Sequence, residues 1–442
     1  MKKTILFAFL FFSLISTTYS QTDSTKTEEE QVKTGFNFGA LPVVAYNSDI
    51  GFQYGVLANL YFFGDGSRYP LYDHSIYLEW SRSTKGNGNN VFRYDSDKLI
   101  PGIRTTAEAS YRTEKALNFY GFNGYQSYYN ANYEDDTSPD YISRMFYRHE
   151  RKVVVLKADF QGSIIGRKLR WLAGITYLGS KIASVDIAKL NEGKDEADKL
   201  PDTAGLYDLY VDWGVIKDEQ KSGGNNAFFK TGFVFDTRDN EPNPNSGMWS
   251  EALFLIGPKF MGEYSSTATA LILIHRQYFT LVPKTLTFAY RLSYQTKTSG
   301  DIPFYILPYL YDSYNIRDGL GGSKTLRGIL RNRVVGDGMA FANFEFRWKV
   351  LKTQFLKQNF YIALSGFADM GRVVDPYVFN RSNIPAQYQS WVNYNPESLH
   401  MSFGAGLHFA MNDNFIVAID YGMATNEQDG TSGLYIGLNF LY

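Results

Sequence analysis

The chain lacks cysteine altogether and contains only 14 prolines among its 442 residues. The absence of cysteine excludes disulfide bonds, thiolate metal sites and a lipid-anchored cysteine behind a signal peptide. Lysine and arginine number 44 and aspartate and glutamate 45, so no basic surplus indicates a nucleic-acid partner. After residue 20, no apolar run is long enough for a transmembrane helix. Any membrane-crossing part is therefore expected to consist of strands.

The first twenty residues have the pattern of a secretory signal peptide. A basic pair, Lys2 and Lys3, precedes an apolar run that is too short to span a bilayer and small residues that suit cleavage. Residues 21–34 are polar and charged, and they are fewer than the ~50 residues of the smallest usual domain. We therefore expect a signal peptide over 1–20, a disordered periplasmic tail over 21–34 and a single domain over 35–442.

Aromatic residues make up 17% of the chain, and many recur at every second position, the period of a β-strand. In residues 433–442, for example, one face carries Leu434, Ile436, Leu438, Phe440 and Tyr442. An apolar face of about ten residues matches a tilted membrane-spanning strand, whereas a soluble sandwich shows shorter ones. We interpret the repeated alternation as a closed transmembrane β-barrel, and the aromatic surplus as its lipid-facing girdles.

Counting such runs predicts sixteen strands, an even number that suits closure of an antiparallel barrel. They cover residues 35–47, 49–62, 72–85, 89–97, 101–115, 143–162, 167–183, 225–237, 247–257, 265–279, 284–298, 337–350, 358–372, 400–411, 414–424 and 432–442. The long connections all follow odd-numbered strands: 116–142, 184–224, 299–336 and 373–399. Outer-membrane barrels have short periplasmic turns and long extracellular loops, so this segregation supports the count. The predicted fold class is an all-β transmembrane antiparallel barrel in the bacterial outer membrane.

Five short motifs occur along the chain in the same order as in a known family. They are "FYGFN" (119–123), "FDTRDNEPNPNSGMW" (235–249), "TLRGI" (325–329), "ANFEFR" (342–347) and "GFAD" (366–369). Together they resemble the BamA/TamA-type outer-membrane barrels, also called bacterial surface antigens. The resemblance implies that "TLRGI" is the Arg-Gly motif of the sixth extracellular loop. It also implies that this long loop folds back into the lumen.

The same resemblance implies a role in assembling or translocating outer-membrane proteins or lipids. Family members carry periplasmic POTRA domains ahead of the barrel, and the polar stretch before the first strand is too short for one. We therefore expect a member stripped to its barrel, with no catalytic residues, no cofactor and no metal. The expected partners are outer-membrane lipid, other envelope proteins and unfolded barrel substrates, but not nucleic acid. The rival hypotheses are a passive or gated pore and a barrel scaffold that binds partners through its loops.

The loop "GGSKTLRGILRNRVVGDG" (321–338) carries the residues of greatest interest. Glu345 and Asp369 fall on inward faces of neighbouring predicted strands, and a guanidinium can bond two carboxylates directionally. Arg327 is the expected cation, and Gly328 would let the backbone turn tightly. The resemblance implies the same structural or gating lock. The alternative is a solvated loop, whereas a phosphate-binding loop is excluded because no Gly-Lys-Ser/Thr ending opens a helix.

A second motif lies in the predicted turn after residue 237. Asp236 and Arg238 fall on the same inward face and are expected to pair. Two prolines, Pro242 and Pro244, stiffen the connection before Gly247 starts the next strand. We interpret this motif as a polar periplasmic turn.

Three further features have competing interpretations. His400, Ser402 and Asn414 resemble the His-x-Ser plus Asn arrangement of the outer-membrane phospholipase, but the first two face the predicted lumen, away from lipid. The acidic, aromatic segments 127–144 and 190–210 could bind calcium or a partner, and we expect solvated extracellular loops instead. Pro42 in the first strand removes a ladder donor, which suits an edge and hints at a weak seam between the first and last strands.

Overall fold

The computed structural model describes residues 33–442 apart from five short gaps at 69–71, 167, 242, 356–357 and 412–414. The expected signal peptide over 1–20 and almost all of the expected tail lie outside the described residues. Among the described residues, no helix is long and apolar enough to cross a membrane.

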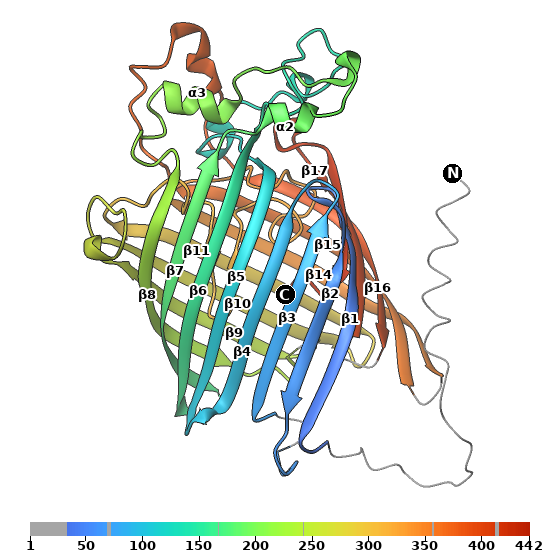
Figure 1. The fold of residues 1–442 in the computed structure, drawn as a ribbon. Helices are drawn as coiled ribbons and strands as arrows, with labels where there is room; N and C mark the ends of the chain where they lie inside the picture. Colours follow the sequence, from blue (N-terminus) through green and yellow to red (C-terminus); the bar gives the residue numbers. More distant parts are fainter. Residues whose placement is uncertain (1–32, 69–71, 167, 242, 356–357, 412–414) are drawn as a thin grey trace.

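Sixteen antiparallel strands of the described chain close into one barrel, in sequence order around the wall (Figure 1). The prediction of the fold and of the number of strands is therefore confirmed. The strands are β1 (Phe36–Asn47), β2 (Gly51–Phe62), β3 (His74–Ser83), β4 (Gly88–Ile100), β5 (Ile103–Asn118), β6 (Arg148–Ile165), β7 (Leu169–Ala183), β8 (Gly223–Asp236), β9 (Gly247–Gly257), β10 (Ala268–Val282), β11 (Leu286–Ser299), β14 (Gly338–Phe355), β15 (Gln358–Asp375), β16 (His400–Met411), β17 (Phe415–Ala424) and β18 (Ser432–Leu438). Two short strands, β12 (Leu310–Tyr311) and β13 (Ile316–Arg317), form a separate hairpin in the loop between β11 and β14.

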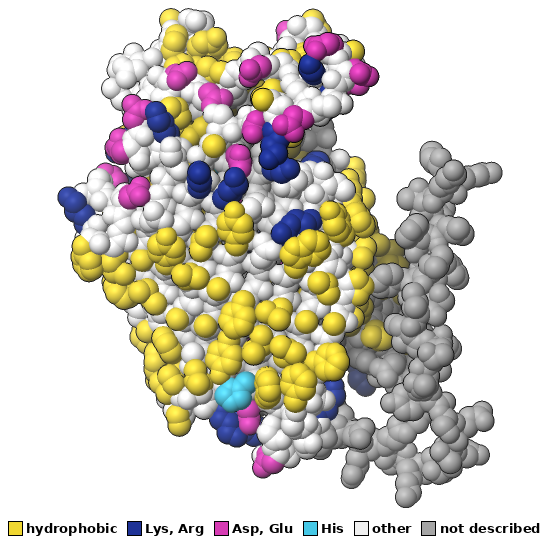
Figure 2. Space-filling model, in the orientation of Figure 1, with side chains coloured by type: hydrophobic (Ala, Val, Ile, Leu, Met, Phe, Trp, Pro, Cys, Tyr) yellow, Lys and Arg dark blue, Asp and Glu magenta, His cyan; other side chains and the backbone are white. Residues whose placement is uncertain are grey.

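Alternation along each strand divides the side chains between lipid and lumen. In β14, Phe346 and Trp348 are each 51% exposed, whereas their neighbours Glu345 and Arg347 are 1% and 2% exposed. Figure 2 shows the outward apolar side chains as a belt across the face in view. Charged residues line the inside because a closed barrel satisfies its backbone in lipid and leaves the lumen polar.

The long loops lie at one end of the barrel, as predicted from their positions after odd-numbered strands (Figure 1). We call loops 119–147, 184–222 and 376–399 the dome. It contains α2 (Ile187–Asn191), α3 (Leu206–Asp212) and four 3-10 turns: Gly124–Gln126, Ala131–Tyr133, Glu196–Asp198 and Ala386–Trp391. Two further 3-10 turns, Lys259–Met261 and Glu427–Asp429, lie in shorter loops at the same end.

The dome loops pack into an aromatic core that they share with the plug, which corrects the expectation that these loops are merely solvated. Tyr129, Tyr207 and Tyr210 come from the two acidic, aromatic segments and are at most 8% exposed. Phe119 meets the Tyr210 ring edge to face, with centroids 5.3 Å apart. The aromatic surplus therefore serves two purposes, lipid-facing girdles and a packed extracellular cap. Composition alone does not separate the two, because both need large, partly polar rings.

The last strand ends earlier than predicted. β18 stops at Leu438, Asn439 adopts a left-handed conformation with φ of 65°, and the chain then turns into the lumen. The expectation that Phe440 and Tyr442 face lipid is wrong, since both are buried. The Tyr442 hydroxyl shares its one proton between two wall carbonyls, and the Arg347 guanidinium lies 4.1 Å from the Phe440 ring centroid. These polar and cation–π contacts with the wall hold the segment inside the barrel.

The seam between the two terminal strands is short. β1 pairs with β2 along its whole length but with β18 only at Tyr46, opposite Ile436, and at Asn47, opposite Tyr435. In the described structure, residues 36–45 of β1 have no paired strand on the seam side. Pro42 lies in that stretch, where a missing N–H is tolerated. The barrel thus presents a partly free strand edge toward lipid.

The lipid-facing assignment of β14 predicts a depth-dependent response to charge. Phe346→Arg places a cation near the middle of the membrane-spanning strand and should lower the free energy of unfolding by about 2–4 kcal/mol. Leu281→Arg, near the periplasmic end of β10, should cost about 0–1 kcal/mol because the cation reaches the interface. Urea titrations of both variants in lipid vesicles measure the difference. Equal losses would contradict the assignment.

Candidate functional site

The loop between β11 and β14 enters the lumen and crosses it. We call residues 300–337 the plug. The β12–β13 hairpin forms its first part, and the segment that contains Arg327 follows. Although the plug is loop-like, many of its side chains are buried, including Leu320, Leu326, Arg327 and Arg333. This burial requires that its charges find partners on the barrel wall.

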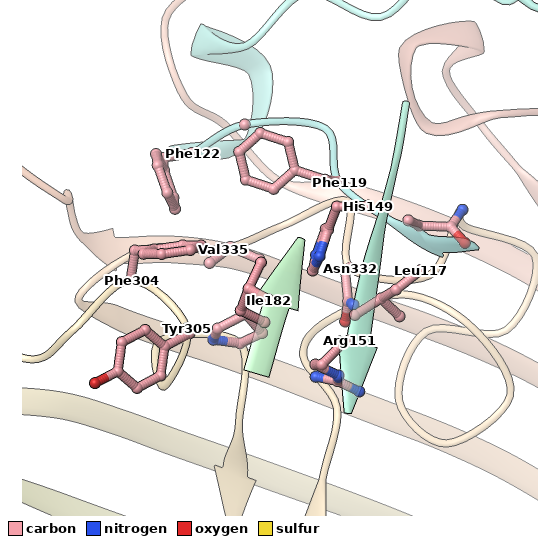
Figure 3. Close-up of a pocket in the computed structure, with 13 residues that line it drawn as sticks. Leu117, Phe119, Phe122, His149, Arg151, Ile182, Phe304, Tyr305, Asn332 and Val335 are labelled. Carbon is pink, nitrogen blue, oxygen red and sulfur yellow. The ribbon is translucent and has the colours of Figure 1, made fainter. Parts of the chain in front are cut away.

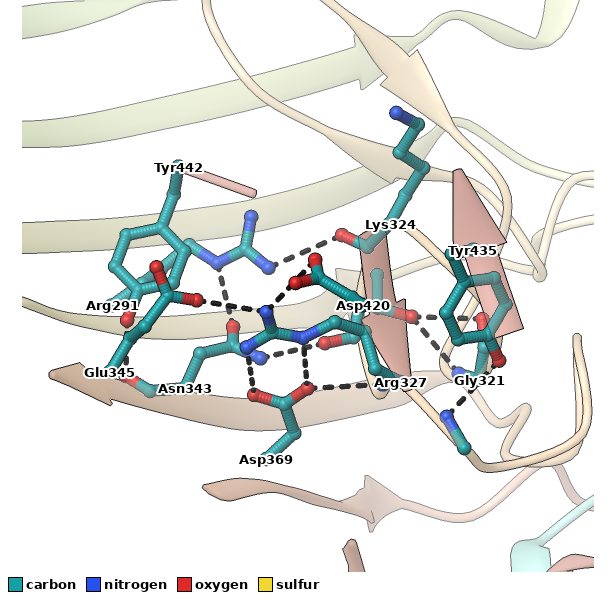
Figure 4. A network of polar contacts seen from close by, with 12 residues as sticks. Arg291, Gly321, Lys324, Arg327, Asn343, Glu345, Asp369, Asp420, Tyr435 and Tyr442 are labelled. Atoms are coloured by element: carbon teal, nitrogen blue, oxygen red, sulfur yellow. Dashed lines mark hydrogen bonds and ion pairs between the residues drawn. The ribbon is translucent and has the colours of Figure 1, made fainter. Parts of the chain in front are cut away.

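The Arg327 guanidinium lies at the centre of a carboxylate cluster (Figure 4). Its Nε and Nη2 donate to the two oxygens of Asp369, at 2.9 and 3.2 Å, in a bidentate pair. Its Nη1 donates to Glu345 Oε2 at 2.8 Å and to Asp420 Oδ2 at 3.3 Å. The backbone N–H of Arg327 also donates to Asp369, at 3.0 Å. Such charge-assisted, bidentate bonds are the strong ones in proteins.

The wall is shaped so that the plug backbone can come this close. Gly328 has a φ of 91°, which an L side chain rarely adopts, and a Cβ there would lie 2.5 Å from the Gly422 carbonyl carbon. On β17, a Cβ at Gly422 would likewise lie 2.5 Å from the Arg327 carbonyl oxygen. The Arg327 Cζ lies 3.4 Å from the ring centroid of Phe367, which lies beneath it. Two glycines and one aromatic ring therefore fix the depth of the arginine.

The structure brings together all four residues that the sequence singled out in this region. Glu345 and Asp369 come from the neighbouring strands β14 and β15, as the alternation placed them. The third carboxylate, Asp420 on β17, was not predicted. The sequence does place Asp420 on the inward face of its strand, but nothing in one sequence indicates that an arginine can reach two strands farther round the wall.

A second arginine supports the cluster from the barrel wall. Arg347 Nε donates to Glu345 Oε1 at 2.7 Å, so each oxygen of this carboxylate accepts from a different guanidinium. Arg347 Nη2 donates to the Tyr442 carbonyl at 2.8 Å. The inward-turned end of the chain is thus joined to the carboxylates that hold the plug.

A second ion cluster fixes the plug to the opposite wall. Arg331 bonds Glu114 on β5 and Asp318 in the plug itself. Arg151 on β6 bonds the same two carboxylates, with its Nη2 2.6 Å from Glu114 and 2.8 Å from Asp318. Burial raises the pKa of Asp318, but Arg151 and Arg331 outweigh burial and hold this pKa well below its ordinary value. The sequence reasoning missed this cluster because its partners are far apart along the chain.

The third arginine of the motif joins the plug to the dome. Arg333 donates to three backbone carbonyls, those of Gly124 at 2.9 Å, Ser127 at 2.8 Å and Gln428 at 2.6 Å. Nearby, a small cavity of about 20 Å³ lies among Phe119, Phe304 and other side chains of the dome, the plug and the upper wall (Figure 3). Such a volume holds about one water molecule, so plug and dome pack closely.

The tip of the β12–β13 hairpin is held by charged wall residues deeper in the lumen. Lys230 on β8 donates to the carbonyls of Asp312 and Ser313, at 3.2 and 3.3 Å. Glu251 on β9 accepts from the Ser313 N–H at 2.8 Å and from its hydroxyl at 3.0 Å. Polar bonds therefore hold the plug at the hairpin tip and at its arginines, on opposite sides of the barrel.

The predicted periplasmic turn forms as expected. Arg238 pairs with Asp236 through two bonds of 3.0 and 3.1 Å, and its guanidinium stacks 4.3 Å from the Trp249 ring centroid. Gly247 begins β9 with a φ of 91°. Pro242 lies outside the described residues. The turn lies at the periplasmic end of the wall, where the charges of Asp236 and Arg238 pair with each other.

The arrangement that resembles a phospholipase is not assembled in the described residues. His400 lies between Asp429, at 2.6 Å, and Glu397, at 3.3 Å. Within the described structure, the Ser402 hydroxyl has no hydrogen-bond partner, so His400 does not activate it. Asn414 lies outside the described residues. His400 instead helps to anchor loop residues above the plug.

Comparison with known proteins decides the family. The model of the Omp85 superfamily domain matches residues 103–440, which is most of the barrel. The chain belongs to the Omp85 superfamily. Membership agrees with the Arg-Gly motif in the plug and places this Omp85 barrel in the bacterial outer membrane. No curated protein matches the chain.

Two solved structures share the fold of this Omp85 barrel. BamA from Haemophilus ducreyi lacking POTRA domains 1–3 aligns with a TM-score of 0.55 and 14% identity, over 92% of this chain and 71% of that chain. CdiB from Escherichia coli aligns with a TM-score of 0.53 and 9% identity, over 93% of this chain and 64% of that chain. The described part of this chain thus spans about two thirds of each relative. At such identities the likeness shows the fold alone.

The geometry of the Omp85 plug predicts a large effect from one substitution. Arg327→Ala would leave three buried carboxylates without their shared cation and should lower the free energy of unfolding by about 3–5 kcal/mol. Arg327→Lys should recover only part of the loss, because an ammonium cannot pair bidentately with Asp369. Denaturant titration and limited proteolysis of the plug measure both effects.

Lys324→Ala is the matched control. Lys324 lies three residues before Arg327 in the same plug, and its side chain points away from Glu345 and Asp369 (Figure 4). Its removal should change the free energy of unfolding by less than about 0.5 kcal/mol. If Arg327→Ala costs no more than this control, the cluster does not hold the plug.

Proposed function

We propose that this Omp85 barrel is a non-catalytic assembly or translocation factor that receives client strands at the seam between β1 and β18. The proposal refines the coarser role of the family, which comprises translocation and assembly barrels. The observation that carries it is the free edge of β1. An unpaired strand edge exposes backbone N–H and C=O groups that another strand can bond.

The exposure of β1 supports a seam that admits another strand. Leu41 is 47% exposed and Val44 54% exposed, so side chains near the free stretch are open to their surroundings. The inward turn after Leu438 leaves room beside this stretch, because β18 no longer runs along it. A client strand could therefore pair with β1 before the existing seam pairs separate.

The plug touches both sides of the seam. Asn47 on β1 donates to the Ser323 hydroxyl at 2.9 Å, and the Gly328 N–H donates to the Tyr435 hydroxyl on β18 at 3.1 Å. In the proposed function, the cluster of Arg327, Glu345 and Asp369 is a structural lock. It keeps the plug where it braces the wall next to the seam. Outer-membrane lipid and unfolded barrel proteins are the proposed partners.

A gated pore is the second candidate, and the polar anchoring of the plug favours it. Ion pairs hold the plug against a charged wall, so its release would open a hydrophilic lumen. The dome favours a scaffold role less, because its aromatic side chains are largely turned inward.

A seam-spanning disulfide tests the proposed function. Because the chain has no cysteine, Tyr46→Cys with Ile436→Cys creates the only thiol pair, at directly opposed positions of β1 and β18. The reduced protein in liposomes should accelerate folding of a model barrel protein, and oxidation should abolish the acceleration. Reductant should then restore it, since only the crosslink has changed.

The control places the same crosslink away from the seam. Ala405→Cys with Tyr421→Cys joins β16 and β17, which are already paired along their length. Its oxidation should leave the acceleration unchanged. Full activity of the oxidised seam variant, or no acceleration by the unmodified chain, would rule the proposal out.

Planar-bilayer conductance tests the pore. Release of the plug by Arg327→Ala should raise conductance strongly if the lumen conducts once opened, whereas Lys324→Ala should not. An unchanged conductance in a variant whose plug has become sensitive to protease would exclude the gated pore.

A further inference from the structure

A row of cations lies on the lipid-facing side of the wall, near the extracellular end. Cross-strand pairing links Arg82 to Gly88, Gly88 to Thr113, Thr113 to Lys152 and Lys152 to Lys181. The five positions therefore form one cross-strand row over neighbouring strands, from β3 to β7. Gly88 and Thr113 are uncharged and separate Arg82 from the two lysines. We call Arg82, Lys152 and Lys181 the basic row.

The side chains of the basic row point away from the lumen. Arg82 shares its face with Trp80, and its Cζ lies 4.9 Å from the Trp80 ring centroid. Lys152 shares its face with the exposed Val154, and its own side chain is 44% exposed. One acid accompanies the row, Glu150, which lies 2.7 Å from the Lys152 ammonium. The row therefore keeps a net positive charge.

Two more lysines extend this charge toward the loops. Lys115 is exposed on β5, two residues beyond Thr113. Lys85 is exposed in the turn between β3 and β4. Figure 2 shows lysine and arginine side chains just above the apolar belt on the face that carries these strands. That height is the outer interface of the membrane, because the long loops mark the extracellular end.

An apolar groove of about 630 Å³ lies directly below the basic row. Its sides are formed by the outward side chains of β3, β4 and β6, among them Leu78, Phe92 and Leu156, which are 41–49% exposed. Between them, at the level of Phe92 and Leu156, the small side chain of Ala109 on β5 is paired with both. The small alanine between larger neighbours creates the groove. Trp80 and Tyr111 line it on the side of the row.

We infer that this face binds one phosphorylated lipid of the outer leaflet, with its headgroup at the basic row and an acyl chain in the groove. The volume lies within the range of about 300–1,000 Å³ for ligand sites. Clustered lysines and arginines at a membrane interface attract anionic headgroups. Trp80 and Tyr111, between the two parts, are the side chains that prefer the level where chains meet headgroups.

The charge distribution selects the class of lipid. A zwitterionic phospholipid would bring its own ammonium next to the basic row and lose most of the attraction. A lipid with two phosphates and no cation, such as the lipid A of outer leaflets, can engage Arg82 and the two lysines together. The extracellular height of the row also favours a lipid of the outer leaflet over one of the inner leaflet.

Binding of diphosphoryl lipid A to the whole chain in detergent micelles tests the inference, with native mass spectrometry as the readout. We expect one lipid A per chain, with weaker binding at high salt because screening reduces the attraction. Lys152→Gln with Lys181→Gln should weaken binding by about tenfold or more. Ala109→Trp should weaken it separately, because the indole fills the groove.

Matched variants away from this face keep the test specific. Lys168→Gln with Lys284→Gln removes two exposed lysines at periplasmic turns, and Ala368→Trp adds an indole to the outward face of β15. Both should bind lipid A as the unmodified chain does. The heat-modifiable mobility of folded barrels in gel electrophoresis checks that each variant is folded.

Three results would overturn the inference. The first is an equal loss of binding in the extracellular and periplasmic lysine pairs. The second is undiminished binding by folded Ala109→Trp. The third is binding of phosphatidylethanolamine or phosphatidylglycerol as strong as that of lipid A, which would reduce the face to ordinary contact with surrounding lipid.

Discussion

A guanidinium keeps its proton in proteins, so the charge of Arg327 must be balanced wherever the plug carries it. Inside the barrel, the balance comes from Glu345, Asp369 and Asp420, which line one side of the wall. This requirement fixes the course of the plug. Gly328 must turn and pass against Gly422 because the arginine cannot reach its three acids from farther away. The depth of this part of the plug therefore depends on one buried ionic interaction.

The other arginines of the plug motif bond partners at other places around the lumen. Arg331 bonds Glu114 on the wall opposite Arg327, and Arg333 bonds carbonyls of the dome. The hairpin tip is held by Lys230 and Glu251. A loop fixed at four places becomes a strut that connects opposite walls. Because breaking a buried pair is costly, local movement of the barrel has to occur where these bonds are absent.

The strands could be predicted from the sequence because lipid and lumen require opposite polarity at successive positions. It also placed Glu345 beside Asp369, since neighbouring strands keep their inward faces adjacent. It did not supply Asp420, two strands farther on, or the pairing of Arg331 with Glu114, which lie 217 residues apart. Nor could alternation foresee the inward turn of Phe440 and Tyr442, because an apolar ring suits lipid and a packed lumen equally. Contacts across the lumen depend on the closed shape, which no single strand encodes.

The distribution of these bonds bears on how the seam could open. The plug reaches the seam through two neutral hydrogen bonds, from Asn47 and to Tyr435, each worth about 1 kcal/mol net. Removal of one partner from its ionic cluster on β14, β15 and β17 costs about 3–5 kcal/mol, because a buried charge is then left unpaired. Parting β1 from β18 thus breaks weak contacts and leaves the strong ones intact. In the proposed function, the seam can admit a client strand while the plug stays in place, so assembly need not open the lumen.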